Sequence, residues 1–228
     1  SQGEEYALPL AQGTHWFELS VSRRDVPAGA PRFFVMTRDI TGSKSAKSEI
    51  RRLAFYDPLT DLPNRRLLQD RLEHALSGTG RHHRFGALLL IDLDNFKALN
   101  DTWGHDKGDL LLKQVAVRLS SCVRDSDTVA RLGGDEFVVL VDDAGHQVAE
   151  ASATARAVAE KVLARLHEPF DVAGREHRSG CSIGVSLFGF ERLSVEEILK
   201  RADVAMYQAK AAGRNALRFF DPAMQQSL

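Results

Sequence analysis

Alternation and spacing of apolar residues divide the chain into a short front segment and a longer body. In the front, residues 15–22 (HWFELSVS) alternate apolar and polar side chains and residues 32–40 (RFFVMTRDI) contain an apolar run, so both are predicted to be strands. The turn-forming sequence VPAGAP at 26–31 lies between them, which predicts an antiparallel pair. About 40 residues bury little core alone, so we expect this segment to belong to a truncated or partner-completed domain.

The apolar spacing changes from strand-like to helical after residue 40. Residues 41–57 place Ile50, Leu53 and Ala54 at helical intervals, which predicts a connecting helix whose narrow apolar stripe suits pairing with a second copy. In the body, helices are predicted from the proline-containing segment 57–66 to about 76, and over about 95–102, 109–122, 146–167 and 194–213. Strands are predicted at 85–94, 127–132, 136–143, 176–188 (as one strand or a pair) and 216–220.

One apolar run contains two acids directly after two glycines. In TVARLGGDEFVVLV, residues 128–141, the apolar stretches on both sides predict two strands, and Gly133 and Gly134 supply the positive φ of a hairpin turn. Asp135 and Glu136 are then expected at the tip of the hairpin and not in the core. Two interpretations are open: a solvated turn, or two carboxylates beside unobstructed backbone N–H groups that suit a metal ion and a polyphosphate.

A second pair of acids ends the buried strand predicted at 85–94. Asp92 and Asp94 are two residues apart and therefore share one face of the strand. An acid before Asn95 also suits a helix cap, so the role of Asp94 is open. Asp92 lies inside the apolar run and needs a partner for its charge. Because Mg²⁺ prefers carboxylate oxygens together with substrate phosphates, Asp92 and Asp135 would share one metal ion if the hairpin adjoins this strand.

The loop KALNDTWGHDKGDLLL carries a neutral amide and an acid. Asn100 and Asp109 either end one helix and cap the next, or together read the edge of guanine. In the second case Asp109 accepts hydrogen bonds from guanine N1–H and the exocyclic amine, and Asn100 donates to an acceptor. His105 is expected to form loop hydrogen bonds and not to act as a catalyst. Three cations are either surface charges or phosphate contacts: Lys97, Lys210 and Arg214.

Composition narrows the class of protein. Of 228 residues, 43% are hydrophobic and 27% are charged, a balance typical of globular domains. The net charge of −1 argues against broad electrostatic binding of nucleic acid. No run approaches about 18 apolar residues, so no membrane segment is expected. Cys122 and Cys181 lack the spacing of a zinc site or a disulfide framework, which indicates a reducing, cytoplasmic compartment.

Four segments together resemble a known family. DPLTDLPNRR, IDLDNFKALNDTWGHDKGDLLL, RLGGDEF and KAAGRN occur in the order found in GGDEF-domain diguanylate cyclases, and the resemblance covers roughly residues 53–222. It implies an α+β fold with a central, mostly antiparallel five-stranded sheet surrounded by helices, similar to nucleotidyl cyclase and polymerase palm cores. It also implies a reaction in which two GTP molecules condense into cyclic di-3′,5′-GMP and two pyrophosphates.

The resemblance implies roles residue by residue. Asp92 and Asp135, with the backbone carbonyl of Leu93, match the family's ligands for Mg²⁺ or Mn²⁺. Asp135 also matches the residue assigned as proton acceptor, a role that Glu136 could share. The residues implied in binding GTP are Asn100 and Asp109 at guanine, Lys210 and Arg214 at the phosphates, and Lys97 and His105 beside them.

A further match lies upstream of the glycines. Arg124 and Asp127 form an R-x-x-D sequence at the spacing of the family's inhibitory site for cyclic di-GMP, although such a pair is elsewhere usually a surface ion pair. Because one domain of this family holds one GTP, the resemblance implies catalysis by a homodimer. The alternative function is a regulatory module that binds GTP or cyclic di-GMP without useful turnover and controls an adjacent domain, for example an EAL phosphodiesterase.

The two ends of the chain also resemble known segments. The front strands and the DIT sequence at 39–41 look like the end of a PAS sensor domain that precedes a signalling helix. The terminal FFDPAMQQSL resembles a junction that leads into an EAL domain, so the full-length protein is expected to carry an upstream sensor and possible downstream domain. The expected boundaries are PAS-like 1–40, linker helix 41–56, GGDEF domain 57–222 and tail 223–228.

Overall fold

The chain separates into two compact units, Ser1–Ala54 and Phe55–Leu228. The turn expected at 26–31 falls, except for its last residue, outside the part of the chain that the structure describes, and so does the tail expected at 223–228. The computed structural model describes residues 3–11, 13–24, 31–82, 84–191 and 193–222.

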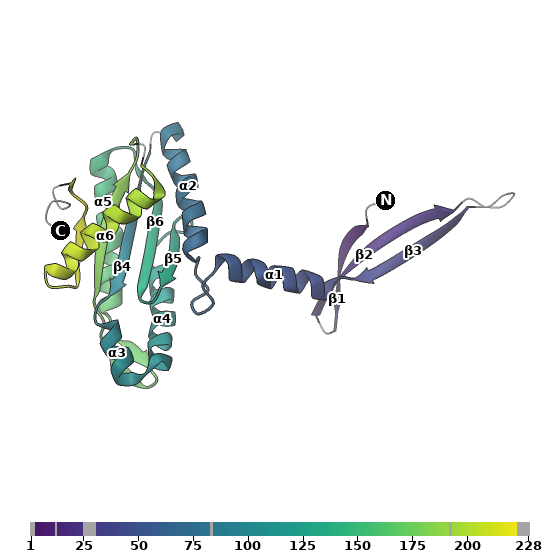
Figure 1. Cartoon of the computed structure of the whole chain (residues 1–228), viewed down its shortest axis with the longest axis horizontal. Coiled ribbons are helices and arrows are strands. Elements are labelled where there is room, and N and C mark those ends of the chain that lie inside the picture. Colours follow the sequence, from purple (N-terminus) through teal and green to yellow (C-terminus); the bar gives the residue numbers. More distant parts are fainter. Residues whose placement is uncertain (1–2, 12, 25–30, 83, 192, 223–228) are drawn as a thin grey trace. The chain divides into compact units, whose positions relative to one another are not determined.

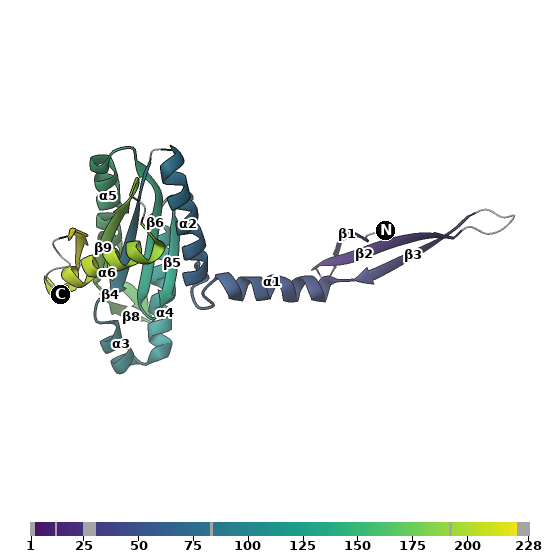
Figure 2. The ribbon, with the colours of Figure 1, turned by 45° about the horizontal axis from the view of Figure 1, so that its top comes forward.

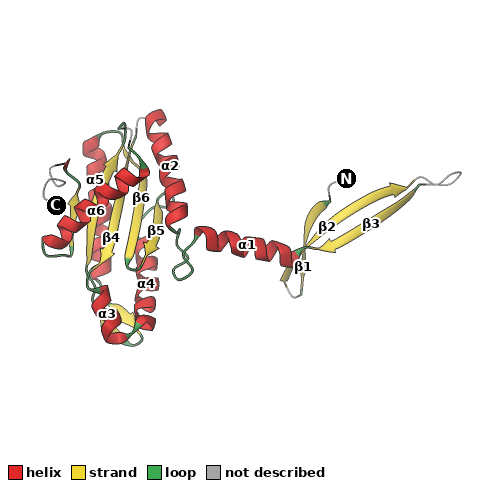
Figure 3. Ribbon diagram, viewed as in Figure 1, coloured by secondary structure: helices red, strands yellow, loops and turns green. Residues whose placement is uncertain are grey.

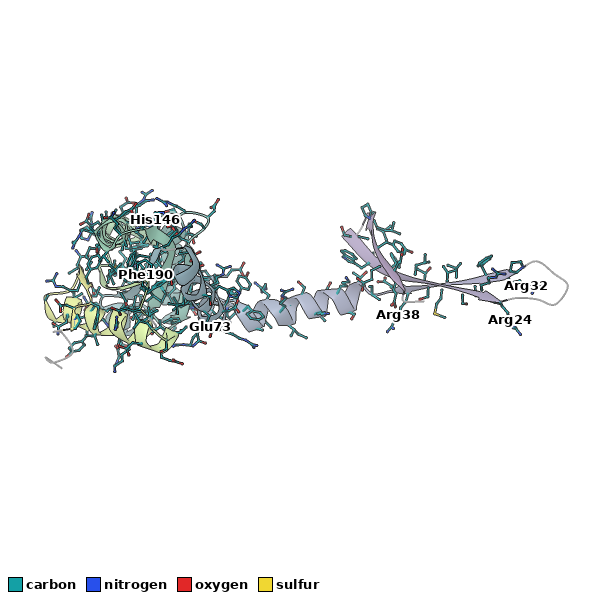
Figure 4. All side chains as sticks on the ribbon, turned by 90° about the horizontal axis from the view of Figure 1, so that it is seen from above. Arg24, Arg32, Arg38, Glu73, His146 and Phe190 are labelled. Atoms are coloured by element: carbon teal, nitrogen blue, oxygen red, sulfur yellow. The ribbon has the colours of Figure 1, made fainter. Side chains whose placement is uncertain are left out.

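The front unit is a three-stranded antiparallel sheet followed by a helix. Its strands β1 (Glu4–Leu10), β2 (Gly13–Arg24) and β3 (Arg32–Asp39) lie in the order β1-β2-β3. The predicted pairing of β2 with β3 is confirmed, whereas β1 was not predicted. Arg24 pairs with Arg32 at one end of the β2–β3 ribbon, as Figure 4 shows. None of the described residues of this unit is buried, which agrees with the expectation of little core.

The helix α1 (Thr41–Phe55) begins where the front sheet ends. The Asp39 carboxylate accepts the backbone N–H of Thr41 at 2.9 Å, and the Thr41 hydroxyl accepts the backbone N–H of Trp16 at 2.8 Å. These contacts fix the first turn of the helix to β2. Along the helix, Ile50 and Leu53 remain 68% and 55% exposed, so the predicted apolar stripe is present on its surface.

A five-stranded mixed sheet forms the centre of the second unit (Figures 1 and 3). Strands β9 and β10 run parallel, and the remaining neighbours run antiparallel. The predicted α+β class with a mostly antiparallel sheet is confirmed. In sheet order the strands are β10 (Ala216–Phe219), β9 (Cys181–Phe188), β4 (Phe85–Leu93), β6 (Glu136–Gly145) and β5 (Thr128–Gly133).

Helices cover both faces of this sheet, because β4 is apolar on both sides. Leu88 and Leu90 point into a core shared with α2 and α6, whereas Leu89 and Ile91 point into a core shared with α3, α4 and α5. Figure 2 shows α6 crossing the face formed by β4 and β9. The helices are α2 (Arg65–His82), α3 (Phe96–Trp103), α4 (His105–Ser120), α5 (Val148–His167) and α6 (Val195–Ala211).

Helix α6 lies unusually close to the sheet at one glycine. A Cβ atom on Gly184 of β9 would lie 2.0 Å from the carbonyl oxygen of Ala202 and 2.3 Å from the backbone nitrogen of Met206. The Ser194 hydroxyl caps the start of the helix by accepting the backbone N–H of Glu197. The close packing holds the middle of α6 at a fixed place over the sheet.

Two predicted helix boundaries were wrong, by four and by six residues. Helix α4 begins at His105 and not near 109, because Gly104, with φ 84°, ends α3 and starts α4 as a single residue between them. Helix α2 continues to His82, six residues beyond the predicted end. Of the two alternatives at 176–188, the pair of strands is confirmed, as β8 (Arg175–His177) and β9. Strand β7 (Phe170–Val172), which pairs with β8 in a small hairpin, was not predicted. Among the described residues, no helix has the length and apolar character needed to cross a membrane.

Candidate active site

The β5–β6 hairpin brings its acids beside the end of β4. Gly133 and Gly134 have φ angles of 142° and 54°, which make the turn that the sequence predicted. Glu136 pairs in register with Asp92, and the backbone N–H of Leu93 points to the carbonyl of Asp135 at 3.4 Å. The hairpin therefore adjoins the strand that ends in acids, which is the arrangement on which a shared metal site depended.

Asp92 is buried and has the partner that its position required. Lys210 of α6 places its Nζ 2.8 Å from Asp92 Oδ2. Burial raises the pKa of the Asp92 carboxyl, and the neighbouring Asp135 raises it further, while the hydrogen bond and charge of Lys210 act in the opposite direction. The net shift is upward, so burial and like charge together outweigh the single cation.

Glu136 lies in the same negative cluster. Burial raises the pKa of its carboxyl, and the charges of Asp92 and Asp203 raise it further, while Arg65 acts against them. A bound cation reduces the repulsion between carboxylates that lie this close together. A donor set made only of oxygens suits Mg²⁺ or Mn²⁺. Among the described residues, no group of three or more histidine, cysteine or acidic side chains is already arranged to hold a metal ion.

Asp94 does not cap α3. Asn95 is the N-cap residue, with φ 61° and no side-chain hydrogen bond at the cap. The Asp94 carboxylate instead accepts the Ser182 hydroxyl and the backbone N–H of Asn215, each at 2.8 Å. The helix-cap interpretation is wrong because two nearer donors, both far away in sequence, satisfy this carboxylate.

The residues considered for guanine lie on two adjacent helices. Asn100 lies within α3, and its Oδ1 is buried without a hydrogen-bond partner in the described part of the chain. A Cβ on Gly108 of α4 would lie 2.0 Å from that oxygen, so the two helices meet at Asn100. Asp109 follows Gly108 and is exposed. The capping interpretation is wrong for Asp109, since α4 begins four residues earlier.

The cations considered for phosphate differ in their surroundings. Lys210 contacts Asp92, whereas Lys97, His105 and Arg214 are exposed. Arg214 lies in the turn after α6, with φ 64° and its backbone N–H directed to the carbonyl of Ala209. The structure therefore joins Lys210 to the acid cluster directly and places Arg214 four residues further along the chain.

Arg131 is a residue of this region that sequence reasoning missed. Its Nη1 lies 2.9 Å from Asp57 Oδ1, and its Nη2 donates to the carbonyl of Gly134 at 2.7 Å. Burial alone would raise the pKa of Asp57, but hydrogen bonds from Thr60 and Arg131 outweigh burial and lower it. One guanidinium thus connects the start of the second unit to the glycine turn. Asp57 and Arg131 both occur in motif segments, although nothing in those segments indicates their contact.

The R-x-x-D residues form a turn before β5. Asp127 Oδ2 accepts the backbone N–H of Arg124 at 3.1 Å, and the N–H of Asp127 donates to the carbonyl of Arg124 at 3.0 Å. The Arg124 side chain is exposed. Both residues line a pocket of about 360 Å³ together with Cys122, Val158 and Lys161.

Comparison with known proteins identifies the family. Residues 54–216 match the family described as diguanylate cyclase, GGDEF domain. MucR of Pseudomonas aeruginosa, a bifunctional diguanylate cyclase/cyclic di-GMP phosphodiesterase, is 45% identical over 81% of this chain and 26% of MucR. The GGDEF domain of YfiN from the same organism is 35% identical, with a TM-score of 0.71 over 75% of this chain and 98% of that domain. The coiled coil and GGDEF domain of DgcB from Caulobacter crescentus, solved with c-di-GMP, is 26% identical, with a TM-score of 0.68 over 79% of this chain and 93% of that one.

The chain therefore belongs to the GGDEF family of diguanylate cyclase domains. It spans about a quarter of the length of curated relatives such as MucR. The predicted family and fold are confirmed. The PAS-like origin of the front strands stays a prediction, and so do the roles of the individual site residues.

Proposed function

We propose that this chain is a diguanylate cyclase that condenses two GTP molecules into cyclic di-3′,5′-GMP and two pyrophosphates. In each half-reaction a ribose 3′-hydroxyl loses its proton, its oxygen bonds to the α-phosphorus of the other GTP, and pyrophosphate leaves. The observation that carries the proposal is the edge where Asp92 and Glu136 lie opposite one another, with Asp135 beside them and Lys210 bonded to Asp92.

The acid cluster is the proposed site of Mg²⁺ or Mn²⁺. Asp92 and Asp135 supply carboxylates and Leu93 supplies its backbone carbonyl, which together form the hard oxygen donor set that these ions prefer. A divalent ion bound there stabilises charge on the attacking and leaving oxygens. Asp135 is the proposed proton acceptor for the 3′-hydroxyl, and Glu136, whose pKa is raised by burial, shares that role.

The remaining contacts hold the nucleotide in place. Asn100 and Asp109 are proposed to hydrogen-bond the guanine edge, where a site built for particular donors and acceptors discriminates strongly between bases. Lys210 and Arg214 are proposed to meet the phosphates, where cationic side chains offset developing negative charge. Lys97 on α3 and His105 on α4 are exposed and are proposed to contribute to GTP binding.

Each chain is proposed to supply one half of the site, so the active species is a homodimer in which two bound GTP molecules face each other. The exposed Ile50 and Leu53 of α1 support this, because two copies of the helix can bury them against each other. The proposed domains are a PAS-like end at 1–40, a linker helix at 41–56 and a GGDEF domain at 57–222.

The direct test is product formation from GTP with Mg²⁺ or Mn²⁺ at increasing protein concentration. A homodimeric cyclase gives a specific activity that rises with concentration, and Asp135→Ala abolishes turnover. Lys113→Ala, at an exposed position on α4 with no proposed role in binding or catalysis, is the matched control and keeps wild-type activity. Absence of product over the whole range of protein and metal concentrations would refute the proposal for this chain.

A regulatory module is the second candidate. The relative MucR carries two activities in one chain, and this chain matches only 26% of its length. In that case the chain binds GTP or cyclic di-GMP and controls an adjacent domain, such as an EAL phosphodiesterase, without useful turnover. Calorimetry that detects GTP binding beside chromatography that detects no product would favour the module.

We also propose that Arg124 and Asp127 bind cyclic di-GMP as a feedback inhibitor. The turn leaves the Arg124 guanidinium exposed at the mouth of a pocket, where it can pair with a phosphate. Arg124→Ala is expected to weaken binding of cyclic di-GMP about tenfold or more, equivalent to one charge-assisted hydrogen bond. Steady-state product is expected to rise. Unchanged product affinity in the variant would contradict the assignment.

A further inference from the structure

Asp94 joins three segments at the end of the sheet nearest the acid cluster. It is 8% exposed and directly follows β4. Its Oδ1 accepts the Ser182 hydroxyl of β9, its Oδ2 accepts the backbone N–H of Asn215, and its own N–H donates to the carbonyl of Gly180 at 3.0 Å. Both carboxylate oxygens are therefore engaged by protein donors.

The segment held by Asp94 has an uncommon backbone conformation. Gly213, Arg214 and Asn215 have φ angles of 113°, 64° and 44°, so three consecutive residues lie in the left-handed half of conformational space. The two non-glycine residues each cost about 1 kcal/mol or more and need support from their surroundings. Within the described structure, the Arg214 N–H is directed to the carbonyl of Ala209 on α6, and the Asn215 N–H is bonded to Asp94.

The surrounding structure is shaped to admit this contact. A Cβ on Gly180 would lie 3.0 Å from Asp94 Oδ2 and 3.1 Å from Asn215 Oδ1, so glycine leaves room for both side chains. One residue after Asn215, Ala216 begins β10 and pairs in register with Ser182, the other partner of Asp94. The carboxylate is thus the point where the turn after α6 is attached to β4 and β9.

We propose that Asp94 is a positioning residue for triphosphate binding, which fixes the backbone of Arg214 beside Lys210. This inference rests on the proposed function, in which Arg214 meets a phosphate. Asp94 acts by accepting hydrogen bonds and not by donating charge to a metal ion, because both of its oxygens already have protein donors. Asp92, two residues earlier, differs from Asp94 because its carboxylate pairs with the charged side chain of Lys210 and is a proposed metal ligand.

Two substitutions at Asp94 separate hydrogen bonding from charge. Asp94→Asn keeps an oxygen that accepts the Asn215 N–H but removes the charge, whereas Asp94→Ala removes both. Binding is measured with Mg²⁺ and α,β-methylene GTP, which cannot release pyrophosphate, and with guanosine, which lacks phosphates. Asp94→Ala is expected to weaken binding of the triphosphate about tenfold, equivalent to one hydrogen bond, and to leave guanosine binding unchanged. Asp94→Asn is expected to bind the triphosphate with wild-type affinity. If Asp94 were instead a metal ligand, replacing its carboxylate by an amide would weaken binding.

A double-mutant cycle tests whether Asp94 acts through Arg214. If it does, Asp94→Ala weakens triphosphate binding little in an Arg214→Ala background, since the residue that it positions is already absent. In a Lys210→Ala background the loss from Asp94→Ala remains about tenfold. Ser186→Ala is the control on β9, because Ser186 does not contact Asp94 or the turn, and it leaves both affinities unchanged. If Asp94→Ala weakens triphosphate binding by the same factor in the Arg214→Ala and Lys210→Ala backgrounds, the inference is overturned.

A second readout does not depend on nucleotide. Amide hydrogen exchange at Asn215, followed by NMR in the free protein, is expected to accelerate in Asp94→Ala and to stay slow in Asp94→Asn. Unchanged exchange in Asp94→Ala overturns the inference whatever the nucleotide result. If the wild-type chain binds neither the triphosphate nor guanosine, the proposed function fails, and the exchange measurement alone decides whether Asp94 holds the turn.

Discussion

Two serines on β9 face the same side of the sheet, but their hydroxyl groups have different surroundings. The Ser182 hydroxyl donates to Asp94, whereas the buried Ser186 hydroxyl has no hydrogen-bond partner in the described part of the chain. Burying a hydroxyl group costs free energy because the group loses its hydrogen bonds to water. A hydrogen bond within the protein offsets most of this cost, whereas a buried hydroxyl without a partner leaves it uncompensated.

Replacing each serine by alanine is therefore expected to have opposite effects. Ser186→Ala leaves the free energy of unfolding unchanged or raises it by up to about 1 kcal/mol. Ser182→Ala lowers it by about 1–2 kcal/mol, because the substitution also deprives Asp94 of a donor. Urea unfolding of the two variants measures the difference. A larger loss for Ser186→Ala than for Ser182→Ala would contradict the assigned contacts.

The contact between Asp57 and Arg131 predicts a pH dependence of stability. The pKa of Asp57 is lowered in the folded chain, so its contribution is complete above the ordinary value of about 4 and is lost as pH falls through the folded value. Asp57→Asn is expected to lower the free energy of unfolding by about 1–3 kcal/mol at pH 7 and pH 5. The difference from wild type should shrink at pH 3. An equal difference at pH 3 and pH 7 would show that the ion pair is not responsible.

At the scale of elements, the close contact of α3 and α4 controls where Asn100 lies. Gly108→Ala would place a Cβ 2.0 Å from Asn100 Oδ1, so the helices must separate or the amide must turn. Either change displaces a proposed guanine contact. We expect KM for GTP to rise about 10- to 100-fold, the scale of effect of a misplacement near 1 Å, and discrimination against ATP to fall.

A second glycine provides the matched control for this experiment. Gly78 lies in α2 without a positive φ, and a Cβ added there would have nothing within 4 Å. Gly78→Ala is expected to stabilise the chain by about 0.5–1 kcal/mol, since alanine restricts the unfolded state and favours the helix. Steady-state kinetics of both variants with GTP and ATP check the prediction. Equal kinetic constants in the two variants would exclude a role for the α3–α4 contact.

Elements with long, regular apolar patterns could be predicted from the sequence. The central strand expected at 85–94 is Phe85–Leu93, because all of its residues after Phe85 form one buried run. Strand β1 was missed because Glu4–Leu10 mixes acids with a proline and shows no clear alternation. Strand β7 was missed because it is three residues long, too short for any period to emerge. The early start of α4 depends on the backbone angle of Gly104, which residue type alone does not specify.

In the candidate site, too, some features could be predicted from the sequence and others could not. Its residues could be selected from the sequence because they occur in recognisable segments, but their contacts could not. Asp57 and Arg131 are 74 residues apart, and the partner of Asp92 is on the last helix. A helix cap was an open interpretation of Asp94, whereas its partners Ser182 and Asn215 come together only when β9 and β10 align. Long-range pairing, not residue chemistry, limited the prediction.

At the scale of the whole molecule, assembly is expected to control activity. Ile50 and Leu53 are exposed on α1, and burying them in a second copy would stabilise a dimer. Ile50→Lys introduces a residue with good helix propensity and places a charge on the apolar stripe. We expect its dimer dissociation constant to rise at least about tenfold, which corresponds to about 1.4 kcal/mol, with specific activity that recovers at high protein concentration.

Sedimentation measurements over a range of concentrations check this expectation. Arg51→Gln, at the neighbouring exposed position outside the apolar stripe, is the matched control and should sediment as wild type. A wild-type dimer that persists unchanged in Ile50→Lys would assign dimerisation to another surface.

The central position of β4 also has a consequence for how the chain is made. Leu93 at the end of β4 pairs with Cys181, about 90 residues later in the sequence. A ribosome that adds about 5–20 residues per second needs roughly 4–18 s to produce that partner. During this interval the apolar segment that forms β4 lacks the partner strand for one of its hydrogen-bonding edges. Unpaired strand edges of this kind promote aggregation. The yield of folded protein is therefore expected to depend on growth temperature and on the supply of chaperones that shield nascent chains.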